Sequence, residues 1–153
     1  MASKVKVRPG LARRRQHHKV LGQYAKYLKP EERLTIACVD FLRFNAPHGV
    51  LWWHTPNEGK RSIVGARIQL AMGLLPGVPD LIILHHWAEQ LRVFFVEFKA
   101  DKYRGLSSAQ EAFRLTIERL PSTTFALCRS LDEFMGLCKE WGLVRAKAKA
   151  KAK

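Results

Sequence analysis

Apolar residues recur at helical spacing in four segments of the chain, and each segment predicts a helix. The first begins at Pro30, with Glu31 and Glu32 in its first turn, and ends near Asn45. Proline at the first position and acidic residues in the first turn both favour a helix start. The other three helices are expected over residues 63–72, 107–120 and 131–142. A shorter helix is predicted around residues 21–28.

Short apolar runs between these helices are typical of buried strands. They cover residues 50–54, 81–84, 92–99 and 123–128. A turn over residues 85–90 is expected to join the second run to the third. The resulting order, αβαββαβα, predicts an α/β protein in which a mixed β-sheet is flanked by helices.

Charge divides the chain into a neutral body and two basic arms. The chain has 153 residues and a net charge of +14 at pH 7. Residues 1–29 hold nine Lys/Arg and residues 144–153 hold five, with no acid in either, so residues 30–143 balance at thirteen against thirteen. We therefore predict one domain over residues 30–143 with an arm at each end. Such arms favour a polyanion, with nucleic acid as the first candidate and an anionic membrane surface as the alternative.

Two further features bear on the compartment in which the protein works. Cys38, Cys128 and Cys138 lack metal-ligand spacing and are expected to be buried thiols in a reduced compartment. No apolar run reaches the ~18 residues of a membrane helix, and no apolar signal region follows the basic start of the chain. These features predict a soluble, non-secreted, cytoplasmic protein without a membrane partner.

The candidate chemistry lies in the stretch VFFVEFKADKYRG, residues 93–105. Glu97 and Lys99 end an apolar strand and are two residues apart, so their side chains share one face of it. Asp80 opens the preceding strand, and if the two strands pair it lies opposite or diagonal to Glu97. Two carboxylates at that distance suit Mg²⁺ or Mn²⁺, and Lys99 would orient a water and neutralise a phosphate. A surface salt bridge between Glu97 and Lys99 is the alternative.

Longer motifs around these residues resemble one nuclease family. The segments NEGKRS, GARIQLAMGLLPGVPDLIIL, FFVEFKADKYRGLSSAQEAF and CRSLDEF are similar to the VRR-NUC family, the virus-type replication-repair branch of the PD-(D/E)xK nuclease superfamily. The resemblance spans roughly residues 31–135. It implies a restriction-endonuclease-like PD-(D/E)xK core with a mixed β-sheet flanked by helices. It also implies a Mg²⁺-dependent hydrolase that cuts DNA, with Mn²⁺ as a substitute and no organic cofactor. No Ser/His/Asp or Cys/His arrangement in the sequence competes as a nucleophile, so water is the expected nucleophile.

The resemblance implies roles for the residues of the core motif. Asp80 and Glu97 would be the metal-binding carboxylates, and the backbone carbonyl of Phe98 would add a metal ligand. Lys99 would be the catalytic lysine.

Two more catalytic candidates follow from the resemblance, each with an alternative. Gln110 matches the family glutamine after the core motif, but S-x-x-Q is also the pattern of a helix capping box with Ser107. Glu31 would be the accessory acid on the first helix, reaching the metal directly or through water. Glu32 and Glu58 are possible substitutes for it.

Polar and basic residues around the motifs are the predicted DNA contacts. They are Arg13, Arg14 and Arg15 in the first arm, Asn57, Lys60 and Arg61 in the Asn-Glu-Gly loop, and Lys102 and Arg104 after the catalytic strand. Stand-alone proteins that resemble this one are homodimers acting on branched DNA, which implies two active sites facing a four-way junction. Trp52, Trp53 and the final helix are candidates for the dimer surface.

Holliday-junction resolution, in recombination or DNA repair in a phage or bacterial setting, is the function expected first. A flap or replication-fork nuclease is the alternative within the same chemistry. A DNA-binding module that keeps the fold without catalysis is the alternative from another class. An RNA-directed enzyme is not distinguished from these by the sequence.

Overall fold

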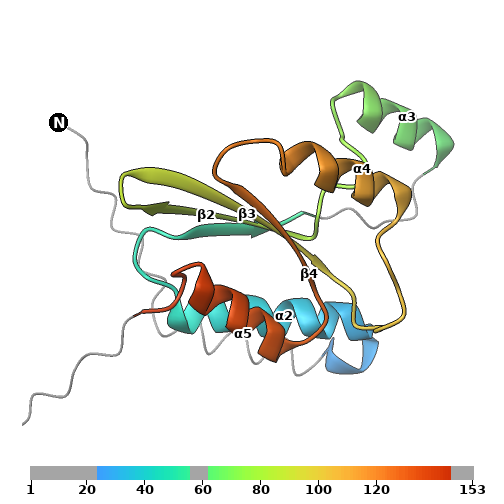
Figure 1. Cartoon of the computed structure of the whole chain (residues 1–153). Helices are drawn as coiled ribbons and strands as arrows, with labels where there is room; N and C mark the ends of the chain where they lie inside the picture. Colours follow the sequence, from blue (N-terminus) through green and yellow to red (C-terminus); the bar gives the residue numbers. More distant parts are fainter. Residues whose placement is uncertain (1–23, 56–61, 146–153) are drawn as a thin grey trace, which may run out of the picture. The chain divides into compact units, whose positions relative to one another are not determined.

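The structure is a computed structural model that describes residues 24–55 and 62–145 (Figure 1). The chain divides into two units, Met1–Pro30 and Glu31–Lys153. In the first unit, the described residues form a short 3-10 helix, η1 (Ala25–Tyr27), where the end of the helix predicted around residues 21–28 would lie.

The remaining helices and strands appear in the predicted order, αβαββαβα. They are α2 (Pro30–Asn45), β1 (Leu51–His54), α3 (Ile63–Ala71), β2 (Leu81–Trp87), β3 (Gln90–Phe98), α4 (Ser108–Ile117), β4 (Thr123–Cys128) and α5 (Leu131–Glu140). None of the helices in the described ranges is long and apolar enough to cross a membrane.

The prediction of a turn over residues 85–90 is wrong. β2 continues to Trp87 and β3 begins at Gln90, so only Ala88 and Glu89 join them. Both have a positive φ, 48° and 64°, as a two-residue hairpin turn that follows the sheet twist requires. Since neither residue is the glycine or asparagine usually found there, turn chemistry gave no signal.

The four strands form one mixed sheet in the order β1-β2-β3-β4. β1 and β3 both pair with β2 in antiparallel fashion, whereas β3 and β4 are parallel. Helices α2 and α5 cover one face of this sheet, and α4 lies on the other (Figure 1). The predicted α/β class, with a mixed sheet flanked by helices, is confirmed.

The main hydrophobic core lies between the sheet and the layer formed by α2 and α5. Leu42 of α2 and Phe134 of α5 are fully buried there, and Phe134 packs on the ring of Phe98 with centroids 5.9 Å apart. The predicted burial of the three cysteines is confirmed, since all belong to this core. The core therefore covers the face of β3 that carries Phe98. The side chains that alternate with Phe98 along the strand point to the other face.

Candidate active site at the end of β3

The pairing of β2 with β3 brings the two predicted carboxylates together. Leu81 is opposite Val96, so the same register extended by one residue sets Asp80 opposite Glu97. Because side chains alternate along a strand, both carboxylates lie on the face that carries α4. The expectation that the two strands pair in this way is confirmed.

Asp80 is held in place from both neighbouring strands. Its carboxylate Oδ2 accepts a hydrogen bond of 2.9 Å from the backbone N–H of Phe98. Its backbone carbonyl accepts the N–H of Thr55, which follows β1, at 2.9 Å. The hydroxyl of Thr55 donates to the carbonyl of Pro79. These bonds fix the Asp80 carboxylate against the end of β3.

Glu97 is buried, with 2% of its surface exposed, and its two oxygens have different surroundings. Oε1 accepts hydrogen bonds from Lys99 Nζ at 2.6 Å and from Gln110 Nε2 at 2.5 Å. Oε2 is buried without a hydrogen-bond partner in the described part of the chain. Lys99 is only 9% exposed, so the two residues do pair, but as a buried ion pair and not as a surface salt bridge.

Burial raises the pKa of Glu97 above its ordinary value. The hydrogen bond from Lys99 acts in the opposite direction, and the negative charge of Asp80 raises the pKa further. A buried carboxylate with one oxygen left unpaired is costly beside a second carboxylate. A divalent cation would supply a partner for Oε2 and place positive charge between the two carboxylates. The residues present therefore fit Mg²⁺ or Mn²⁺, with Asp80 and Glu97 as its protein carboxylates.

The predicted accessory acid does not join this pair. In the described ranges, 24–55 and 62–145, no three His, Cys, Asp or Glu side chains are grouped so that they could hold a metal. Glu31, in the first turn of α2, instead forms an ion pair with Arg104, 3.5 Å between Oε1 and Nη1. This pair ties the start of α2 to the loop that follows β3. Of its possible substitutes, Glu32 is exposed and Glu58 lies outside the described residues.

Gln110 forms the predicted capping box and also contacts the candidate carboxylate Glu97. Its Oε1 accepts the backbone N–H of Ser107 at 2.9 Å, and its own N–H donates to Ser107 Oγ at 3.3 Å, which completes a capping box at the start of α4. Its Nε2 donates to Glu97. One side chain thus caps α4 and orients the Glu97 carboxylate.

Gly77 is a supporting residue that sequence reasoning missed. It has a φ of +83°, and a Cβ at this position would lie 2.2 Å from the carbonyl oxygen of Ala109 in the first turn of α4. The absence of a side chain therefore lets the turn before Asp80 pack directly on the turn that carries Gln110. The sequence signal was the Gly-Val-Pro-Asp segment itself, which was used for the family resemblance and for Asp80 but not for Gly77.

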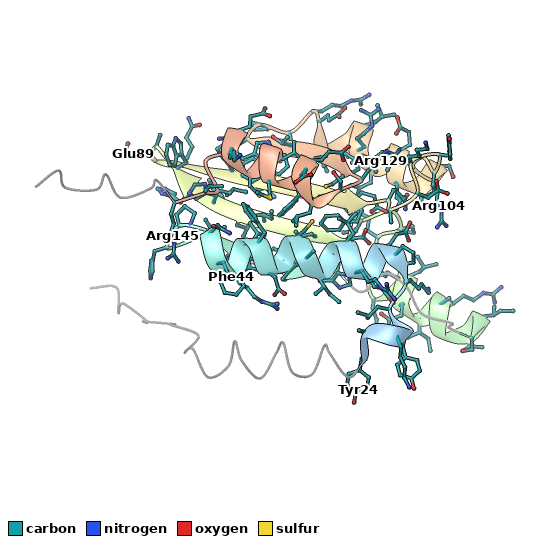
Figure 2. All side chains as sticks on the ribbon, turned by 90° about the horizontal axis from the view of Figure 1, so that it is seen from below. Tyr24, Phe44, Glu89, Arg104, Arg129 and Arg145 are labelled. Carbon is teal, nitrogen blue, oxygen red and sulfur yellow. The ribbon has the colours of Figure 1, made fainter. Side chains whose placement is uncertain are left out.

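A basic loop, residues 99–107, borders the site. Asp101 organises it: its carboxylate accepts the N–H of Tyr103 at 2.9 Å, and its carbonyl accepts Arg129 Nη1 at 2.7 Å. Tyr103 is exposed, and Lys102 Nζ lies 4.8 Å from its ring centroid. Figure 2 shows Arg104 and Arg129 at one end of the domain, opposite the β2–β3 turn marked by Glu89. Arg129 is thus a basic neighbour that was not predicted.

The other predicted DNA contacts cannot be placed against the site. Arg13, Arg14, Arg15, Asn57, Lys60 and Arg61 all lie outside the described residues. Of the predicted set, the structure therefore places Lys102 and Arg104 on the loop after β3.

Burial of Glu97 has a consequence for stability that depends on pH. Because the folded-state pKa is raised, the native protein holds this proton more tightly than the unfolded chain does. The free energy of unfolding should therefore fall as the pH rises from the ordinary value of 4.5 through the folded-state pKa. Urea unfolding in metal-free buffer should show this fall for the wild type and a smaller one for Glu97→Gln.

Mg²⁺ should reverse this loss once the pH exceeds the raised folded-state pKa of Glu97, because a ligand that binds only the native state stabilises it. The same addition should leave Glu97→Gln nearly unchanged. Equal stabilisation of both proteins would mean that Glu97 is not a metal ligand.

Comparison with known proteins adds no assignment to this geometry. The chain matches none of the protein-family models, curated proteins or solved structures with which it was compared. Membership of the VRR-NUC family stays a prediction, and the function is inferred from the residues of the site.

Proposed function

We propose that the protein is a divalent-metal-dependent endonuclease of the PD-(D/E)xK type that hydrolyses phosphodiester bonds in branched DNA. The observation that carries this proposal is the buried Glu97 carboxylate with an unpaired Oε2, opposite Asp80 and bonded through Oε1 to Lys99. A carboxylate pair beside a lysine suits the hydrolysis of an anionic ester, since it combines cation binding with a positive charge for the phosphate. A four-way junction is the proposed substrate, and a homodimer is the proposed active form.

Each residue of the site has a definite task in this proposal. Asp80, Glu97 and the Phe98 carbonyl would hold Mg²⁺, which when bound acts as a Lewis acid toward water and phosphate. Lys99 would leave its bond to Glu97 to donate to the phosphate, where it neutralises the charge that develops during attack by water. Gln110 would keep the Glu97 carboxylate oriented. The basic loop, with Lys102 and the neighbouring arginines, would bind the DNA backbone.

Lys99→Ala should lower the single-turnover rate by about 10²-fold, the usual cost of removing one group that stabilises developing charge. Junction affinity should be almost unchanged, because Lys99 is nearly buried and one of many cationic groups. The matched control is Lys102→Ala, on the exposed loop, which should weaken binding slightly and leave the rate at saturation unchanged. Cleavage by Lys99→Ala at nearly the wild-type rate would show that Lys99 does not act on the phosphate.

Deleting the charged ends should weaken DNA binding and flatten its dependence on salt. Residues 1–12 hold three Lys/Arg and residues 144–153 hold five. Each DNA phosphate that the shortened arms no longer neutralise should lower the slope of log K against log salt by about 0.9. Fluorescence anisotropy of a labelled junction over a salt series measures this slope. An unchanged slope would show that the arms do not engage DNA.

The proposed function is tested by Mg²⁺-dependent cleavage of a four-way junction, a 5′ flap and a plain duplex of matched sequence. Paired, symmetric nicks in the junction are the expected result. Cleavage of the flap alone would support the proposed hydrolysis but identify a flap, and not a four-way junction, as the substrate. Tight binding with no cleavage in Mg²⁺ or Mn²⁺ would instead identify a DNA-binding module without catalysis.

A further inference from the structure

Helix α3 is apolar but buries none of its side chains against the described residues, 24–55 and 62–145. It contains no buried residue, and its bulky side chains Ile63, Val64, Ile68 and Leu70 are all exposed, as are Met72 and Leu75 just after it. Both figures show it at the periphery of the domain, clear of the sheet (Figures 1 and 2). A helix that is apolar around most of its circumference is normally buried. Among the described residues, no surface packs against α3 to bury its apolar side chains.

The sheet has an exposed apolar surface of its own, because none of the described helices covers half of one face. On the face that carries α4, the helix packs over β3 and β4, where Phe113 meets Phe95 with ring centroids 5.3 Å apart. On that face, none of the described helices lies over the part made by β1 and β2 (Figure 1). There Leu51 and Trp53 are 58% and 42% exposed, beside the half-buried side chains of their partners on β2. We call this part the β1–β2 face; its residues are Leu51, Trp53, Ile82 and Leu84.

We propose that these two surfaces cover one another in a dimer, with α3 of each protomer packed on the β1–β2 face of its partner. A helix layer against a sheet face is the standard way to bury both in an α/β fold. The arrangement is reciprocal, so a two-fold axis satisfies both surfaces at once. Segment 63–75 has thirteen residues and the β1–β2 face has four, so each protomer supplies at most seventeen, somewhat fewer than the roughly 20–30 of a standard interface.

The charge distribution favours a second copy over the chain's own arms. Residues 1–29 carry nine basic residues and no acid, a composition suited to a polyanion and poorly suited to an apolar sheet face. Residues 30–143 are balanced in charge, so two such bodies can approach without net repulsion. The excess charge of the chain thus belongs to segments that form no part of the proposed contact.

The interface would lie beside the candidate active site. Asp80 is on the same face of the sheet as Ile82, two residues along, and Thr55 continues the row of Leu51 and Trp53. The partner's helix would therefore hold two sites in one fixed pair, as symmetric incision of a junction requires. This inference deepens the proposed function and rests on the homodimer proposed there. Its test measures the molecular mass of the protein in solution and not cleavage.

Sedimentation velocity of the full-length protein tests the interface. The wild type should be a dimer at micromolar concentration, whereas Ile68→Glu on α3 and Leu51→Glu on the β1–β2 face should each raise the dissociation constant by at least about 100-fold, because each puts a charge into an apolar contact. Leu120→Glu is the matched control, since Leu120 and Ile68 are each 53% exposed and Leu120 lies outside both surfaces. This variant should remain a dimer. Unchanged circular dichroism and melting temperature would show that the variants are folded.

Mixing the two variants tests the reciprocal geometry. A heterodimer of Ile68→Glu with Leu51→Glu keeps one of its two contacts intact, so the mixture should form dimers at concentrations where either variant alone is monomeric. A monomeric wild type would overturn the proposal, since α3 or an arm would then have to cover the face within one chain. Loss of dimers in Ile68→Glu alone would overturn it in favour of α3 pairing with α3. A cleavage assay run in parallel distinguishes a failed interface from failed chemistry.

Discussion

Asp80→Asn and Glu97→Gln should each lower Mg²⁺-dependent cleavage by at least about 10³-fold, while the affinity for a four-way junction stays close to that of the wild type. The change corresponds to about 4 kcal/mol in the barrier. The reason is that each substitution keeps the shape of the side chain and removes one of the two negative charges that would hold the cation. Binding should persist because most phosphate contacts would come from the arms and the basic loop. Single-turnover cleavage and fluorescence anisotropy measure the two quantities.

Unfolding is not expected to explain this loss of activity. Glu97 is a buried acid whose pKa is raised, so its neutral isostere should be at least as stable as the wild type at neutral pH. Glu111→Gln is the matched control, because Glu111 lies one residue after Gln110 but pairs with Arg114 outside the site. It should cleave like the wild type. Cleavage by Glu97→Gln within tenfold of the wild-type rate would falsify the metal-binding role of Glu97.

Gly77→Ala should destabilise the protein by about 2–5 kcal/mol, although it adds one methyl group in a turn. The new Cβ would meet backbone atoms of Ala109 at 2.2 and 2.4 Å, and backbone cannot move aside as a flexible side chain can. Overpacking costs typically 1–3 kcal/mol, and a positive φ in a residue with a side chain adds about 1–2 kcal/mol. Since α4 must shift, Gln110 should lose its bond to Glu97 and turnover should fall as well.

Gly73→Ala separates the two contributions. Gly73 has a similar φ of +94°, but a Cβ there would meet nothing within 4 Å. It should therefore show only the conformational cost of about 1–2 kcal/mol and keep its activity. Urea unfolding of the two variants gives the difference directly. If both lost the same stability, the contact of Gly77 with α4 would not be important.

The sequence by itself determined the order of the elements and the meeting of Asp80 with Glu97. Both follow from local rules, because apolar periodicity distinguishes helix from strand and a hairpin sets the start of one strand against the end of the next. The sequence did not predict the position of the turn between β2 and β3, since Ala88 and Glu89 form this hairpin turn without the glycine or asparagine that usually marks one. Sequence also located the excess charge at the two ends of the chain.

Only the tertiary structure decided how the site is enclosed. Whether Glu97 and Lys99 form an exposed or a buried pair depends on α4, whose position is set by a contact with Gly77 that is distant along the chain. Contacts between segments distant along the chain also gave Gln110 its bond to Glu97 and paired Glu31 with Arg104. The sequence also did not predict the exposed β1–β2 face. Apolar spacing shows that a side chain is to be buried, but it does not show which helix or sheet buries it.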